Sequence, residues 1–224
     1  MGQCHAHLGA GPGSQCAVSA RDAEEAKGDV IDIVLDVEPC SLPPGFELAL
    51  FRELTRKAPW LATDPRVGVH PMRGNRLNDG GLLLGGRAKL TVRCPRDMLC
   101  KASVIEGAKL SVDGVEVKLG AGTFRRLQHA PTLYSPRVVT GHEEEVAFTK
   151  QLEAEVAALG VRASLIAGRR SDVIRDGRRY AAWSLALHDL NREASLALQS
   201  AGLGLLRDVG CGILQPAKTI SLTD

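Results

Sequence analysis

The predicted order of strands and helices is the feature that most restricts how this chain can fold. Apolar residues alternate over 29–38, which indicates a strand with one buried face. The helical spacing of Phe46, Leu50 and Leu54 then predicts a helix over 46–58. The other elements of this half are a short strand at 68–74, a strand at 87–94, a short helix at 95–107 and a hairpin at 109–119. Asp113-Gly114 is the turn of that hairpin, because this dipeptide favours a two-residue turn.

The second half of the chain repeats the same order. A strand at 132–140 precedes a helix for which Thr140 and Glu143 are the expected capping box and Gly160 the expected end. The later elements are strands at 162–167 and 179–188, a helix at 191–201 capped by Asn191 and ended by Gly202, and a last strand at 211–216. Two strand-helix-strand-strand-helix-strand units predict an α+β protein of tandem ferredoxin-like (RRM-like) domains.

These units give the expected domain organisation. Residues 29–120 are predicted to form the N-terminal ferredoxin-like domain and residues 121–224 the C-terminal one. Residues 1–28 have no hydrophobic periodicity, so we expect a disordered tail there.

Composition and net charge limit the class of protein. The 224 residues carry a formal charge of +2, with 44% hydrophobic and 24% charged residues, which are ordinary values for a soluble globular protein. No apolar run approaches the length of a transmembrane helix, and the first residues lack the pattern of a signal peptide. The six cysteines are irregularly spaced and form no C-x-x-C pair, and in a chain of this size without a secretion signal we expect reduced thiols. We therefore expect a cytoplasmic protein that does not contact a membrane.

No residue pattern predicts a metal or cofactor site. The sequence has no H-x-x-x-H pair and no cluster of carboxylates. Cys4, His5, His7 and Cys16 lie close together, but their spacing fits no standard structural zinc site. We expect neither a metal ion nor a cofactor.

The segment GLGLLRDVGCG at 202–212 contains four glycines around Arg207. It follows a predicted helix and leads into a strand, which is the reverse of a Walker loop or a dinucleotide fingerprint. Its backbone N–H groups and its arginine suit an RNA backbone, so Gly202, Gly204, Arg207, Gly210 and Gly212 are candidate RNA-binding residues. The alternative, equally supported by the residues, is a connection that lets two domains pack closely.

An arginine-rich segment at 168–180 favours RNA binding. Arginine binds phosphate through two parallel hydrogen bonds and also stacks on bases. The candidate RNA-binding residues of this segment are Arg169, Arg170, Arg178 and Arg179. The alternative is a solvated loop without a ligand.

Several motifs together resemble a known family. They are the string G-L-G-x-x-R-x-x-G-C-G-x-x-x-P-x-K-x-I that starts at Gly202, GVHPMRG at 68–74, Trp60-Leu61 and L-x-L-H-x-L at 185–190. Over residues 29–222 the chain resembles the Cas-six group of CRISPR-associated endoribonucleases, within the RAMP superfamily and its MYXAN-subtype branch. The sequence departs from the branch at Ala217, since relatives often carry histidine before the lysine of P-x-K.

The resemblance implies an activity and partners. It implies metal-independent cleavage of precursor CRISPR RNA within its repeats by attack of a ribose 2′-OH on the adjacent phosphate. The products would be a 2′,3′-cyclic phosphate and a 5′-OH end. It further implies CRISPR repeat RNA and other subunits of a type I effector complex as partners. Ala217 keeps a second function open, that of a non-catalytic repeat-binding subunit, and a small-molecule enzyme on the same scaffold is a third, weaker alternative.

Histidine is the side chain best suited to move protons in such a reaction near neutral pH. The resemblance places the general base of related nucleases in the segment that contains His70, so His70 is our first candidate and His188 the second. Arg73 and Lys218 are the cations expected to stabilise charge on the phosphate.

Overall fold

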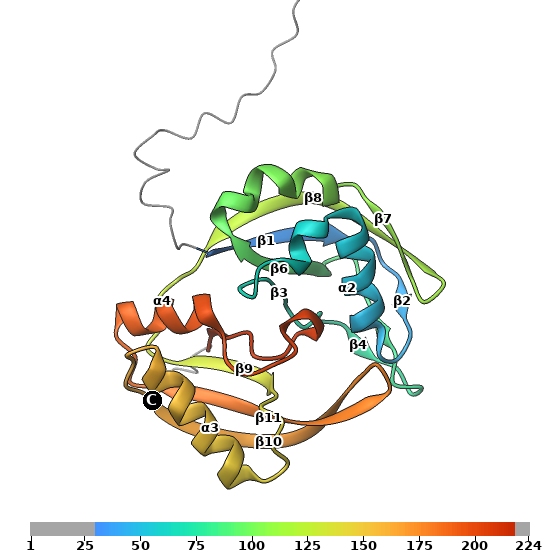
Figure 1. Cartoon of the computed structure of the whole chain (residues 1–224). Coiled ribbons are helices and arrows are strands. Elements are labelled where there is room, and N and C mark those ends of the chain that lie inside the picture. Colours follow the sequence, from blue (N-terminus) through green and yellow to red (C-terminus); the bar gives the residue numbers. More distant parts are fainter. Residues whose placement is uncertain (1–29, 218–224) are drawn as a thin grey trace, which may run out of the picture.

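The computed structural model describes residues 30–217, which form two α+β halves, each built on an antiparallel sheet (Figure 1). The predicted tail at 1–28 and Lys218 lie outside the described residues. The first half contains β1 Val30–Val37, β2 Ser41–Leu42, α2 Phe46–Lys57, η1 Pro59–Ala62, β3 Gly68–Val69, β4 Asn75–Arg76, β5 Leu82–Leu83, β6 Lys89–Pro95, η2 Arg96–Ile105, β7 Lys109–Val112 and β8 Val115–Arg126. The second half contains β9 Leu133–Val138, α3 Glu145–Ala158, β10 Ser164–Arg175, β11 Arg178–His188, α4 Arg192–Ala201, η3 Arg207–Val209 and β12 Gln215–Pro216.

Both sheets have the strand order of a ferredoxin-like fold. The first is β3-β6-β1-β8 with β7 added at the edge, and the second is β10-β11-β9-β12. The order of the elements along the chain and in space therefore confirms the tandem ferredoxin-like prediction. In the first half the second helix of the motif is the 3₁₀ helix η2, and β2, β4 and β5 form a small separate sheet.

Each half has its own hydrophobic core. Leu50 and Leu54 of α2 are buried in one cluster with Ile33 of β1. In the second half Phe148 of α3 packs against Trp183 of β11, with ring centroids 5.8 Å apart. The period of the apolar residues in the sequence is what places these side chains on one face of each element.

Three predictions, about one hairpin turn and the ends of two helices, are confirmed. Asp113 and Gly114 form the β7–β8 turn with φ of 47° and 85°. Gly160 follows the end of α3 with φ of 70°. The side chain of Asn191 accepts a hydrogen bond from the backbone N–H of Ala194 at 2.8 Å, which caps α4.

Two predictions about boundaries are wrong. The capping box does not form, because α3 starts at Glu145 and the Thr140 hydroxyl instead accepts a hydrogen bond from the backbone N–H of His142. The domain boundary at residue 120 falls inside β8, which stays paired with β1 as far as Arg126. The polar segment after 120 shows no strand periodicity, so only its pairing with β1 makes it a strand.

The glycine-rich segment 202–212 lies between the two halves of the molecule, where its trace in Figure 1 runs from α4 past β3 and β9. A small third core joins the halves there, in which Val209 and Cys211 are buried with Val139 and Ala182, and Leu48 of α2 packs against them. The backbone N–H groups of Gly202, Gly204, Gly210 and Gly212 all donate hydrogen bonds to other atoms of the protein. These N–H groups are therefore not free to bind an RNA backbone, and the small core shared by the two halves favours the alternative, close packing of two domains.

Close contacts explain why glycine stands at these positions. A Cβ built on Gly212 would lie 1.9 Å from the carbonyl oxygen of Leu203, and one on Gly204 would lie 2.3 Å from that of Val139. Gly212 also has φ of +66°, a region that residues with a Cβ rarely adopt. At Gly212 and Gly204 a side chain is excluded because two backbone segments of the second half meet, whereas Gly210 faces the first half, with its Cβ position 3.3 Å from Pro71.

We expect Gly212→Ala to destabilise the protein by about 2–4 kcal/mol, the sum of backbone strain and overpacking. Gly177→Ala is the matched control, since Gly177 has φ of +74° but nothing within 4 Å of its Cβ position, and should cost about 1 kcal/mol. Urea unfolding of both variants measures the difference. Equal losses would contradict the packing role of Gly212.

Candidate functional site

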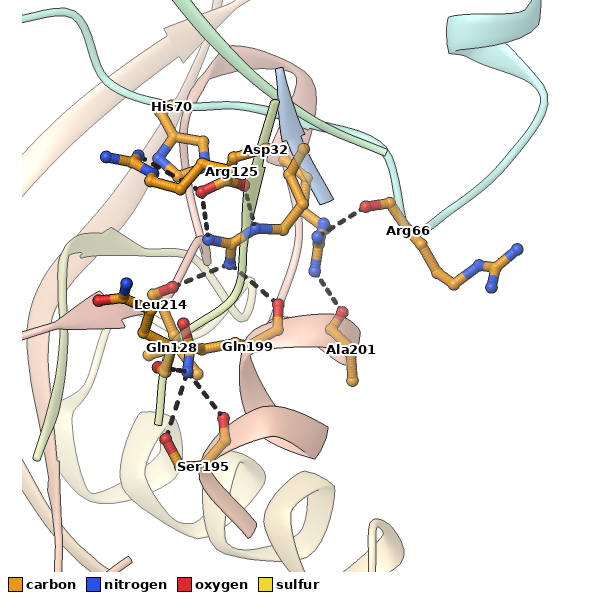
Figure 2. Close-up of polar contacts among 11 residues, drawn as sticks. Asp32, Arg66, His70, Arg125, Gln128, Ser195, Gln199, Ala201 and Leu214 are labelled. Carbon is orange, nitrogen blue, oxygen red and sulfur yellow. Dashed lines mark hydrogen bonds and ion pairs between the residues drawn. The ribbon is translucent and has the colours of Figure 1, made fainter. Parts of the chain in front are cut away.

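A buried arginine ties the two halves together. Arg93 of β6 is 1% exposed, and its guanidinium donates to both carboxylate oxygens of Asp32 on β1, at 2.8 and 3.2 Å. The same guanidinium donates to the backbone carbonyls of Gln199 and Leu214 in the second half, at 3.0 and 2.9 Å (Figure 2). The hydrogen bonds from Arg93 to these two carbonyls therefore fix the position of α4 and of the chain before β12 relative to the first sheet.

His70 lies beside this ion pair, as Figure 2 shows. Its backbone N–H donates to the carbonyl of Thr91, which continues the pairing of β3 with β6. Its imidazole is 7% exposed, and Nε2 lies 3.3 Å from an oxygen of Asp32 in a geometry too poor for a hydrogen bond. Burial lowers the pKa of His70, and the cations Arg93 and Arg125 lower it further, against the opposing effect of Asp32. The ring is therefore neutral at neutral pH.

The Asp32 carboxylate is the anionic centre of this cluster. Burial raises the pKa of Asp32, but its interactions with His70 and Arg93 outweigh burial, so the pKa lies well below its usual value. Arg125 of β8 approaches the second carboxylate oxygen at 3.6 Å and keeps a 59% exposed side chain. Asp32 is thus ionised and surrounded by cations.

A polar cavity of about 230 Å³ adjoins the cluster at the boundary between the halves. It is lined by Asp32, His70, Arg93, Arg125, Arg126, Leu127, Gln128, Gln199, Gln215 and Pro216. Gln199 is 1% exposed, and its side-chain Oε1 accepts no hydrogen bond from any of residues 30–217. Its Nε2 donates to the backbone carbonyl of Gln128 and to Ser195, so the amide is held in this orientation.

A larger cleft of about 770 Å³ lies next to it. It is lined by Pro71, Met72, Arg73, Thr132, Tyr134, Pro136, Ala186, His188, Gln215, Pro216 and Ala217. His188, the last residue of β11, is half-buried, and its Nδ1 lies 3.2 Å from the hydroxyl of Thr132. Among the described residues Nε2 of His188 has no partner. The two cavities share Gln215 and Pro216, so β12 lies where they meet.

The structure brings some of the predicted site residues together and separates others. His188 and Arg73 line the larger cleft, and so does Ala217, the position at which relatives often carry histidine. His70 lines the smaller cavity instead. Of the three candidates for catalysis, His188 lines the larger cleft and His70 the smaller cavity, while Lys218 directly follows Ala217 outside the described residues.

Arg207 is not a free surface cation, which argues against the RNA-binding role predicted for it. Its guanidinium donates to the backbone carbonyl of Arg66 at 2.8 Å and to that of Ala201. Burial lowers the pKa of Arg207 to about 10, with a further contribution from Arg93. Arg207 joins the end of α4 to the segment before β3, which is a structural role.

The arginine-rich segment is a paired hairpin rather than a loop. β10 and β11 pair from Arg170 opposite Trp183 to Arg175 opposite Arg178, so the turn is only Asp176-Gly177. The four candidate arginines of this segment, Arg169, Arg170, Arg178 and Arg179, are exposed. Arg179 pairs with Asp172 at 3.4 Å and Arg170 approaches Glu143 at 4.0 Å, and both stay largely accessible.

Sequence reasoning missed four residues of the site. Tyr134 in the larger cleft and Asp32, Arg93 and Gln199 around the smaller cavity carry no motif of their own. A charged residue on the apolar strands β1 and β6 was the available signal, because a charge buried in a strand needs a partner. The ion pair of Asp32 and Arg93 joins residues 61 positions apart in the chain, so it could not be inferred from the local sequence.

Two further features of the described residues concern metal sites and membrane-spanning helices. No group of three or more His, Cys, Asp or Glu side chains within residues 30–217 is placed to hold a metal ion. Within the same range no helix is long and apolar enough to cross a membrane.

The fold of this chain is similar to that of solved structures. The structure described as "Characterization of a Cas6-related gene from Pyrococcus furiosus" covers 85% of this chain and 99% of its own, with a TM-score of 0.63 at 11% identity. The one described as "An RAMP protein binding different RNA substrates" covers 84% of this chain and 100% of its own, with a TM-score of 0.62 at 11% identity. At these identities the likeness shows the fold alone, which agrees with the two ferredoxin-like halves described above.

Comparisons of the amino-acid sequence identify the family of the chain. The family model Cas6 (Cas6 Crispr) matches residues 31–219. The CRISPR-associated endonuclease Cas6 of Myxococcus xanthus (strain DK1622) is 33% identical over 187 residues, which are 83% of this chain and 81% of the relative. The chain therefore belongs to the Cas6 family, which confirms the resemblance drawn from its motifs.

Proposed function

We propose that this protein is an endoribonuclease that cleaves precursor CRISPR RNA within its repeats without a metal ion. Membership of the Cas6 family and the M. xanthus relative, which is a CRISPR-associated endonuclease, support the class of reaction. The observation that carries the proposal is the larger cleft, in which a histidine with a free ring nitrogen, a tyrosine and an arginine line one space of about 770 Å³.

The chemistry assigned to the cleft is a transesterification. Nε2 of His188 takes the proton of a ribose 2′-OH as its oxygen attacks the adjacent phosphorus. The bond from phosphorus to the 5′-oxygen breaks, and that oxygen receives a proton, for which the hydroxyl of Tyr134, a residue that lines the cleft, is the assigned donor. The products are a 2′,3′-cyclic phosphate and a 5′-OH. The proton count balances and no cofactor is required.

Neighbouring residues support each role. Thr132 contacts Nδ1 of His188, a residue that lines the cleft, and so fixes the ring and leaves Nε2 for the substrate. Arg73, an exposed residue, supplies positive charge for the phosphate in the transition state, and Lys218 is the second cation assigned to this task. His188 replaces His70 as our first candidate for the base, since the imidazole of His70 is almost fully buried beside an ion pair.

The exposed arginines of the β10–β11 hairpin are assigned to RNA binding. Arg178 and His188 are the two ends of β11, an 11-residue strand, so about 30 Å separates the hairpin tip from the cleft. RNA held at Arg178 and Arg179 would thus lie outside the cleft, where a duplex stem flanking the cleavage position is the expected contact. Other subunits of a type I effector complex remain proposed partners.

Single-turnover incubation with the repeat RNA of the protein's own CRISPR locus tests the proposal. In EDTA we expect one cut per repeat, with a 2′,3′-cyclic phosphate that resists ligation on the upstream fragment and a 5′-OH that a kinase labels on the downstream one. Cleavage that requires a divalent cation would contradict metal independence. Tight binding without any cut would instead support the non-catalytic repeat-binding subunit.

A further inference from the structure

The smaller cavity is not used by the proposed cleavage chemistry. It has about 230 Å³, and since one water molecule occupies about 30 Å³, it holds a group much larger than a single ion. Its lining combines amide groups, which both donate and accept hydrogen bonds, with guanidinium groups, which only donate. A nucleobase presents both donors and acceptors on its edges, which this lining matches.

An unpartnered acceptor lies in the wall of this cavity. Oε1 of Gln199 is buried and receives no hydrogen bond from residues 30–217, while Nε2 of the same amide is fully engaged with Ser195 and Gln128. In Figure 2 this oxygen lies on the side of Leu214, away from Ser195. A buried acceptor without a donor costs about 1–3 kcal/mol, so a ligand that supplies an N–H group at this point is favoured.

The charge distribution places a phosphate at the mouth rather than inside. Arg125 and Arg126 are exposed, and Arg126 has no partner among the described residues. Inside the cavity the carboxylate of Asp32 and the Gln199 oxygen would repel a phosphate group. Anion binding at the mouth and hydrogen bonding inside are the requirements of a nucleotide whose base enters first.

The position of the cavity also fits a strand of RNA. It meets the larger cleft at Gln215 and Pro216, so one chain of nucleotides can reach both without crossing the protein surface. We propose that the cavity receives one unpaired nucleotide of the substrate RNA, with its base against Gln199 and Gln128 and its phosphate at Arg125 and Arg126. This inference rests on the proposed function and adds a second subsite to it.

The test combines abasic RNA with two exposed residues of the cavity. A set of repeat RNAs, each with a single abasic site at one unpaired position, is titrated against the wild-type protein at one fixed salt concentration. We expect one position at which loss of the base weakens binding about 10-fold or more, the range for a base held in a specific site. In the Arg125→Met, Gln128→Ala variant, affinity for intact RNA should fall similarly, and the sensitivity to that abasic position should shrink below 2-fold.

Arg87→Ala is the matched control, because Arg87 is an exposed arginine that lines neither cavity. The Arg87→Ala variant should show the same loss of affinity as the wild-type protein when the base at that position is removed from the RNA. Equal melting temperatures of the variants exclude misfolding, since the two substituted cavity residues are exposed. If RNA binds but every abasic site weakens the wild-type and variant proteins by the same factor, the nucleotide subsite is overturned and the proposed function stands. If the wild-type protein binds no repeat RNA, both are overturned.

Discussion

His188→Ala should lower the single-turnover rate of repeat-RNA cleavage by about 10²–10⁴-fold, the contribution of a well-placed general base. The ring lines the larger cleft, its Nδ1 is held by Thr132, and its Nε2 has no partner among the described residues, so the substitution removes a proton acceptor and little packing. Affinity for the repeat RNA should change less than 3-fold, since binding depends on cations elsewhere. Rates with saturating enzyme and affinities from filter binding give the two quantities.

Two histidine variants control this prediction. His129→Ala removes an exposed imidazole that lines neither cavity and should leave the rate unchanged. His70→Ala changes a buried residue, so its cleavage must be measured at a temperature where the variant is folded. A full loss in His70→Ala together with wild-type cleavage in His188→Ala would return the role of base to His70.

Arg93→Met should destabilise the protein by about 3–5 kcal/mol, because it leaves the carboxylate of Asp32 buried without its main partner. The substitution also removes the donors to the carbonyls of Gln199 and Leu214, which lie in the other half of the molecule. A loss of this size lowers the melting temperature by about 10 °C. Denaturant unfolding at pH 7 measures it, and an Asp32→Asn change added to Arg93→Met should restore part of the stability.

Lys89→Met is the matched control for Arg93→Met. Lys89 lies on the same strand and also pairs with an aspartate of β1, Asp36, but both side chains are about half exposed, at 50% and 53%. An exposed ion pair contributes about 0–1 kcal/mol, so the control should unfold almost as the wild type does. A loss in Arg93→Met no larger than in the control would show that the domains are held together without this arginine.

Local features of the fold could be predicted well from the sequence. The alternation of apolar residues in β1, the helical spacing in α2 and the Asp113-Gly114 turn are visible in a few consecutive residues, since each follows from backbone geometry. Their order was enough to predict two ferredoxin-like units. The motifs spread over the chain were enough to predict the family. The extent of β8 was missed because its last residues become a strand only through pairing with β1.

The site could be predicted less well, because burial and partners depend on residues distant in the chain. Arg93 contacts carbonyls 106 and 121 positions away, and no local pattern announces them. The same glycines that suggest an exposed RNA-binding loop instead make room for two backbones, since a missing side chain serves either purpose. Local sequence periodicity specifies which elements form and in what order. Which histidine is buried beside a charge and which lines an open cleft depends on the packing of one domain against the other, because a side chain's exposure and electrostatic partners are set by everything that surrounds it in space.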